Sequence, residues 1–244
     1  MTATRRARDM VRFARRTPCL VLLVVQLAGV LLYPFMETTY AGRAAFSLFG
    51  LLVLTLTVLA LRATPFFSWV AGLAAMPSVV LLLLNVFLDT PVLYAWSAGF
   101  EMVVYFYAAI SMLAYMLHDD EVTTDELFAI PAVFTLLAWG FAYLFVLVQA
   151  LSPSSFGSDE TRSWMDLLFL SFTTLSSTGL SDILPVTGHA RSVVMLEQVA
   201  GVFYVAMVVT RLVALRGQRG QRTGQQSVQR DPSRRDETSE ERPS

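Results

Sequence analysis

One stretch near the C-terminus switches between apolar and polar character in a way that few folds accommodate. Residues 164–174 form a short apolar run, residues 176–182 read SSTGLSD and are mostly small and polar, and residues 190–215 are apolar again. Non-helical backbone persists at membrane depth only where protein or a water-filled path satisfies its amides and carbonyls. The pattern therefore predicts a short helix and a re-entrant loop, followed by a spanning helix, at a permeation site.

Apolar runs elsewhere in the chain indicate an all-α integral membrane protein. Hydrophobic residues make up 55% of the 244 residues and charged residues only 15%, and about 20 consecutive apolar residues cross a bilayer core. The predicted spans are residues 18–36, 44–62, 66–88, 92–117, 127–151 and 190–216. The first of these is expected to be retained, because the sequence YPFME near its end offers no small-residue cleavage site for a signal peptidase.

Arginine sets the predicted orientation, because all 18 basic residues are Arg. Six of them precede residue 18, and several more follow the last span. Since cytoplasmic segments carry the excess of basic residues, both termini should be cytoplasmic and the polar loop 176–182 should enter from the outside. We expect a multi-pass protein of the cell membrane, in contact with the lipid bilayer.

These boundaries divide the chain into four regions. They are a basic cytoplasmic N-terminus at 1–17, a four-helix membrane domain at 18–126, a pore domain at 127–216 and a disordered cytoplasmic tail at 217–244. The tail has too few apolar residues to form a packed core. Residues 92–117 carry no Arg, whereas a voltage-sensing helix carries basic residues that move across the field. The four-helix domain is therefore structural, or it senses something other than voltage.

The polar loop resembles the selectivity filter of the potassium-channel superfamily. The family filter reads TTVGYGD, and the sequence TTLSSTGLSDILP at residues 173–185 falls on the same frame without a gap. The resemblance implies a homotetramer, in which four loops meet on one axis, and a monovalent cation such as K⁺ at carbonyls and hydroxyls of Ser177, Thr178 and Gly179. The filter residues that it implies are Ser177, Thr178, Gly179, Leu180, Ser181 and Asp182.

Two filter positions depart from the family pattern. Ser181 stands where the family has its second glycine, and a residue with a Cβ adopts left-handed backbone at a cost of roughly 1–2 kcal/mol. Leu180 replaces the family's tyrosine, and Leu170 stands where one of its aromatic partners usually lies. We therefore expect strain at Ser181 and a reshaped outer filter. The single-glycine string is also similar to the filter loops of the Trk and Ktr potassium uptake proteins, which conduct monovalent cations.

Residues outside the loop are predicted to support it. Glu197 lies in the last span at a depth behind the filter, where it is placed to accept hydrogen bonds from Thr173 or Thr174. Gly201, one turn later, has two interpretations. It is a gating hinge, because glycine lets a helix bend, or it packs closely against a neighbouring helix, and the sequence leaves both open.

Two acidic residues also have two interpretations each. Four copies of Asp182 around an axis would form an acidic ring that concentrates cations, or its carboxylate would bond to the end of the short helix and hold the loop in shape. Glu101 lies within the span 92–117, where carboxylates are rare and usually functional. Its alternative is a structural role, paired with a hydroxyl or close to the outer interface.

The sequence as a whole predicts a tetrameric cation channel that conducts potassium with weakened selectivity. The alternatives are a non-conducting or heteromeric channel-like subunit, and a membrane sensor or scaffold. A scaffold has no reason to keep the loop polar. An enzyme is not expected, because no paired carboxylates, Ser/His/Asp set or metal-ligand cluster converges at one membrane depth. We expect neither a cofactor nor a nucleic-acid partner.

Overall fold

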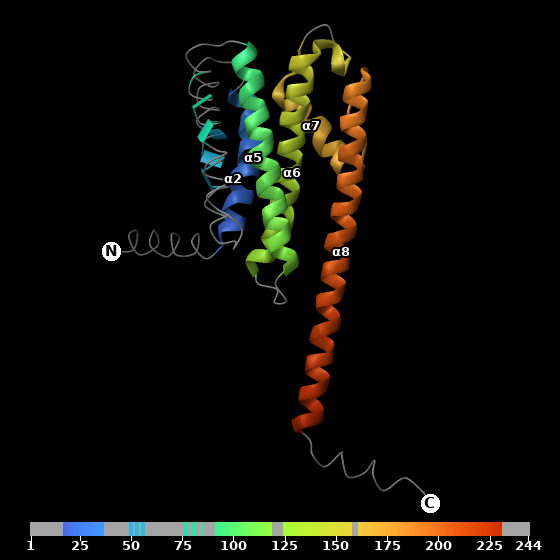
Figure 1. Cartoon of the computed structure of the whole chain (residues 1–244). Coiled ribbons are helices and arrows are strands. Elements are labelled where there is room, and N and C mark those ends of the chain that lie inside the picture. Colours follow the sequence, from blue (N-terminus) through green and yellow to red (C-terminus); the bar gives the residue numbers. More distant parts are fainter. Residues whose placement is uncertain are drawn as a thin grey trace, which may run out of the picture. The chain divides into compact units, whose positions relative to one another are not determined.

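The computed structural model describes residues 17–36, 91–118, 124–157 and 161–230, with isolated short pieces between residues 49 and 84. These parts of the chain contain helices and no strand. In chain order the elements are α2 (Pro18–Met36), α5 (Pro91–His118), α6 (Thr124–Leu151), the short 3-10 helix η1 (Pro153–Phe156), α7 (Trp164–Leu175) and α8 (Gly188–Arg230) (Figure 1).

Four of these helices contain apolar segments long enough to cross a membrane. The segments are Pro18–Phe35, Val92–Leu117, Leu127–Leu151 and Gly188–Val213, and they agree with four of the predicted spans. The chain is therefore a multi-pass membrane protein. α7 is shorter than a span, as the sequence predicts. The predicted spans 44–62 and 66–88 fall almost entirely outside the described residues.

α6 is the central helix of the membrane part, because it packs against α2, α5 and α7. Most of its buried residues are apolar, and Leu136 and Phe145 among them are fully buried. Gly140 lets α5 approach closely, since a Cβ at this position would lie 3.1 Å from the ring of Phe106. A buried hydrogen bond of 2.7 Å from Thr135 Oγ1 to Gln26 Oε1 joins α6 to α2. Such polar pairs stabilise helix packing within a membrane.

An aromatic cluster connects the first helices to the beginning of α7. The Trp164 ring, in the first turn of α7, lies 5.2 Å from the Trp139 ring, 5.9 Å from the Tyr143 ring and 5.4 Å from the Tyr33 ring, measured between centroids. Tyr105 of α5 stacks on Tyr143 with a centroid distance of 5.5 Å. Packed aromatic rings give the helix start a defined position. α7 therefore begins against α2 and α6, and through Tyr143 it is linked to α5.

The end of α8 differs from the prediction. The sequence predicts a disordered tail from residue 217, but α8 continues as a helix to Arg230, and residues 231–244 lie outside the described part. The reason is that extending an existing helix avoids the cost of nucleation, and Gln and Arg are good helix formers. The chain divides into two compact units, residues 1–204 and 205–244, and the site described below lies in the first.

Candidate functional site

The start of α7 is fixed by side chains that satisfy its free backbone groups. Ser163 is the N-cap: its Oγ accepts from Asp166 N at 3.2 Å, and Asp166 Oδ2 accepts from Ser163 N at 3.1 Å. This reciprocal pair is a capping box. Just before it, the Gln149 amide bonds to both backbone groups of Arg162, at 3.0 Å and 2.8 Å. α7 therefore begins at a position that α6 holds.

The end of α7 is closed by the polar loop, which folds back on the last turn. Thr173 O accepts from the backbone N–H groups of Thr178 and Gly179 at 3.0 Å and 3.1 Å, and from Thr178 Oγ1 at 3.2 Å. Ser177 and Gly179 both have left-handed backbone, with φ of 59° and 66°. Left-handed backbone therefore occurs at two loop positions, Ser177 and Gly179, that are separated by one residue.

The predicted strain at Ser181 is wrong. Among the described residues, Ser177 is the one non-glycine residue with positive φ, while the Ser181 side chain accepts from Ile183 N at 3.1 Å. The physical reason lies in the helix end. Ser176 is the C-cap of α7, and the residue after a C-cap commonly adopts left-handed backbone to satisfy the last carbonyls. Ser177 occupies that position.

The predicted filter residues lie on the surface of the single chain. Ser177, Thr178 and Gly179 are exposed, as is Asp182, and Leu180 is 76% exposed. A Cβ built on Gly179 would meet no atom within 4 Å. The polar groups of this loop are therefore exposed and accessible from outside the chain.

The segment between the loop and α8 is also held by hydrogen bonds. Val186 N donates to Ser155 O at 2.9 Å, and Thr187 Oγ1 bonds to Ser155 Oγ at 3.2 Å. Thr187 Oγ1 also accepts from Ala190 N in the first turn of α8, at 3.3 Å. Ser155 is completely buried in η1. The loop is thus held at α7 on one side and at η1 on the other.

Glu197 of α8 contacts α7, but through a different residue from those predicted. It is completely buried and is hydrogen-bonded to Ser171 Oγ. The Ser171 hydroxyl also lies 2.8 Å from Ala138 O of α6. Thr173 Oγ1 instead donates to Leu170 O within α7 at 2.9 Å. Ser171 therefore joins α6, α7 and α8 at one point, and it is a site residue that the sequence reasoning missed.

Gly201 lies against the last residue of α7. A Cβ at Gly201 would stand 2.1 Å from Leu175 O and 2.9 Å from Leu175 C, far inside van der Waals contact. Close packing, one of the two interpretations left open by the sequence, is therefore present at this position. A role as a gating hinge stays a prediction.

Only a narrow stripe of α8 faces its own chain. The buried residues of its membrane part are Ala190, Val194, Glu197, Gly201 and Tyr204, at alternating spacings of four and three. The Tyr204 hydroxyl donates to Ile130 O of α6, so that the stripe ends on a further polar contact. Most of the remaining circumference is apolar and exposed.

The two acidic residues with open interpretations are found in different environments. Glu101 of α5 is buried and hydrogen-bonded to the Tyr143 side chain of α6, which agrees with its pairing to a hydroxyl. Asp182 is exposed and forms no hydrogen bond or ion pair with the residues that the structure describes. The described residues also contain no group of three or more His, Cys, Asp or Glu side chains placed to hold a metal ion.

Comparison with known proteins assigns this part of the chain to a family. A family model described as ion channel matches residues 132–216, which run from α6 through α7 and the polar loop into α8. Protein LctB of Geobacillus stearothermophilus is 32% identical over 96 residues, which cover 36% of this chain and 71% of LctB. No solved structure matches significantly. The chain therefore belongs to this ion channel family.

Proposed function

We propose that the chain is one subunit of a homotetrameric cation channel that conducts potassium through the loop 176–182. The filter residues in this proposal are Ser177, Thr178, Gly179, Leu180, Ser181 and Asp182. Carbonyl and hydroxyl oxygens of Ser177, Thr178 and Gly179 would replace part of the hydration shell of K⁺. One loop cannot encircle an ion, so that several subunits must supply it.

The observation that carries this proposal is the loop at the end of α7. Its left-handed residues, Ser177 and Gly179, alternate along an exposed segment, and this segment directly follows the C-terminus of the helix. The carboxyl end of a helix carries a partial negative charge of roughly half an elementary charge. A cation is therefore favoured over an anion at this place.

Assembly of several subunits is supported by the exposed faces of α7 and α8. The exposed apolar residues there include Phe169, which is 48% exposed, and Leu196, Val202 and Phe203, which are 60–67% exposed. Neighbouring copies and lipid together would cover these faces. In the proposed tetramer the subunit has six spans and both termini are cytoplasmic.

Weakened selectivity is part of the proposal. Leu180 is exposed, and it offers no hydroxyl that would tie the loop outward to α7. Its counterpart Leu170 is buried. The outer part of the filter is therefore less constrained than one with two glycines and a tyrosine, and sodium should be rejected less strongly.

A liposome flux assay with the purified full chain tests this function. We expect flux of K⁺ above that of Na⁺ and no flux of Cl⁻. Gly179→Ala should lower the flux, because it places a Cβ on backbone with φ of 66°, which L residues rarely adopt, although the Cβ would meet no atom of the chain within 4 Å. Gly99→Ala in α5 is the matched control. Cl⁻ flux equal to K⁺ flux, or no K⁺ flux from an assembled oligomer, would overturn the proposal.

A further inference from the structure

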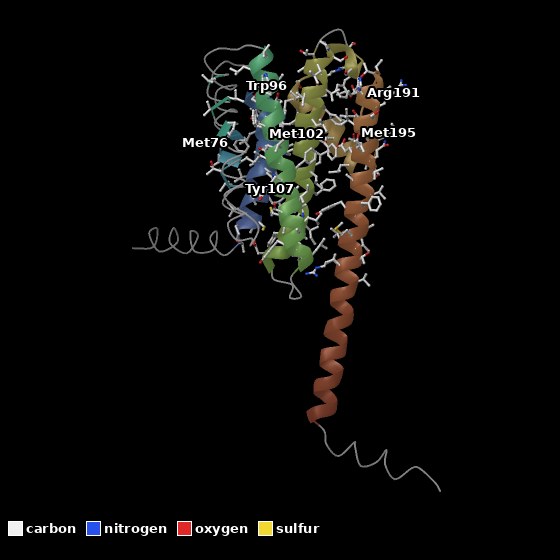
Figure 2. All side chains as sticks on the ribbon, in the orientation of Figure 1. Met76, Trp96, Met102, Tyr107, Arg191 and Met195 are labelled. Carbon is white, nitrogen blue, oxygen red and sulfur yellow. The ribbon has the colours of Figure 1, made fainter. Side chains whose placement is uncertain are left out.

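A cationic side chain of α8 contacts the segment that follows Asp182. Arg191, in the first turn of α8, is exposed, and its Nε donates to Pro185 O at 3.1 Å. Figure 2 labels it near the beginning of that helix. Its guanidinium group therefore lies back over the segment that leaves the filter, and no part of the predicted conduction site accounts for it.

The position of Pro185 limits the distance between the two charges. Pro185 follows Asp182 by three residues, so that the Cα atoms of these two residues lie at most roughly 11 Å apart. The side chains of Asp182 and Arg191 extend this span, and the screening length at 0.01 M salt is about 30 Å. Both groups therefore act on ions in the same volume of solution.

The two charges do not neutralise each other by direct contact. Asp182 has no ion pair among the described residues, and Arg191 donates to a backbone carbonyl instead. Each charge is exposed to solvent. An ion that approaches the loop therefore meets an attractive carboxylate and a repulsive guanidinium together.

We propose that Arg191 limits cation conductance at the outer mouth, where its positive charge offsets Asp182 and lowers the local concentration of cations. This inference rests on the proposed function, because it requires that cations enter past the loop. In a tetramer, four guanidinium groups would balance four carboxylates. Coulomb's law in water gives each charge at about 10 Å a factor of roughly two in local ion concentration.

The orientation of Arg191 favours this role over that of a lipid anchor. An arginine that anchors a span extends its side chain toward the head groups. Here the Nε atom is held at Pro185 O, in the loop that also carries Asp182. A lipid anchor remains an alternative outcome of the test below.

Conductance at different salt concentrations tests the inference. Arg191→Gln should raise cation conductance about two- to tenfold at 0.01 M KCl, where the screening length is about 30 Å, and the difference should vanish near 1 M, where it is about 3 Å. Arg191→Lys keeps the charge and should behave like the original chain. The double variant with Asp182→Asn should also return close to the original conductance, because it removes both charges.

Arg162→Gln is the matched control for position. Arg162 belongs to the segment before α7, and its Nε bonds to Phe156 O in η1 at 3.4 Å, so that its removal should change conductance less than that of Arg191. The inference is wrong if Arg191→Gln leaves conductance at 0.01 M unchanged or lower, if Arg162→Gln has the same effect, or if the effect requires anionic lipid in the vesicles. If the original chain conducts no cations at all, the proposed function itself fails.

Discussion

Gly201 of α8 packs directly on the backbone carbonyl of Leu175, the last residue of α7. One turn earlier on both helices, Glu197 bonds to Ser171. The same spacing of four residues therefore joins the two helices at two successive points. These two contacts fix the position of α8 along its axis, and its rotation about that axis, relative to α7.

Replacing Gly201 with Ala should separate the two helices. The added Cβ would lie 2.1 Å from backbone, and overpacking of this kind costs about 1–3 kcal/mol. Thermal unfolding of the detergent-solubilised oligomer measures the loss, and flux should fall with it. In Gly99→Ala, the nearest atom is Leu147 Cδ2 at 4.0 Å, and stability should hold or rise. Equal stability of the two variants would show that α8 does not pack closely against α7 at Gly201.

A double-mutant cycle distinguishes the two partners considered for Glu197. Ser171→Ala and Glu197→Leu should be coupled by about 1 kcal/mol or more, because each removes one partner of the same buried hydrogen bond. Thr173→Val paired with Glu197→Leu should show coupling near zero, since the Thr173 hydroxyl bonds within α7. Unfolding free energies in the same detergent give both coupling energies. A larger coupling for the Thr173 pair would restore the partner predicted from sequence.

Ser177→Gly should relieve backbone strain that Ser181→Gly does not. Ser177 has φ of 59°, and left-handed backbone costs a residue with a Cβ roughly 1–2 kcal/mol. We expect Ser177→Gly to stabilise the loop and to change the ratio of potassium to sodium permeability, while Ser181→Gly leaves both nearly unchanged. Bi-ionic reversal potentials measure the ratio. The reverse pattern would mean that strain in the filter is located at Ser181 after all.

Asp182→Asn should lower cation conductance most at low ionic strength. The substitution keeps the size of the side chain and removes the charge, so that its effect should be large at 0.01 M and small at 1 M, as screening lengths of about 30 Å and 3 Å require. Conductance measured across this salt range is the test. If conductance falls by one constant factor at every concentration, Asp182 holds the loop in shape and does not concentrate ions.

Much of the fold could be predicted because hydropathy is a local signal. The four described spans follow from apolar length alone, and the short apolar run that begins at residue 164 agrees with the start of α7 at Trp164. The helical segment after residue 217 could not be predicted from composition, because low hydrophobicity excludes a packed core and not a continued helix.

The details of the site could not be predicted from the sequence. They depend on how each helix is rotated about its axis and on the backbone conformation of the loop. Ser171, Thr173 and Thr174 all carry hydroxyls on α7, and the depth of Glu197 does not reveal which of them faces α8. The signal that was missed is the common spacing of four in Ser171 and Leu175 and in Glu197 and Gly201. The position of strain was assigned from the family frame, whereas the helix end places left-handed backbone at Ser177.

The reversal potential of the purified full chain in a tenfold KCl gradient tests the central claim most directly. A cation channel should reverse close to the potassium equilibrium potential, about 59 mV in magnitude for a monovalent ion. Permeability to sodium does not affect this reversal potential, because the solutions contain only K⁺ and Cl⁻. A reversal potential near zero, or one of opposite sign that follows chloride, would contradict conduction of cations through the loop.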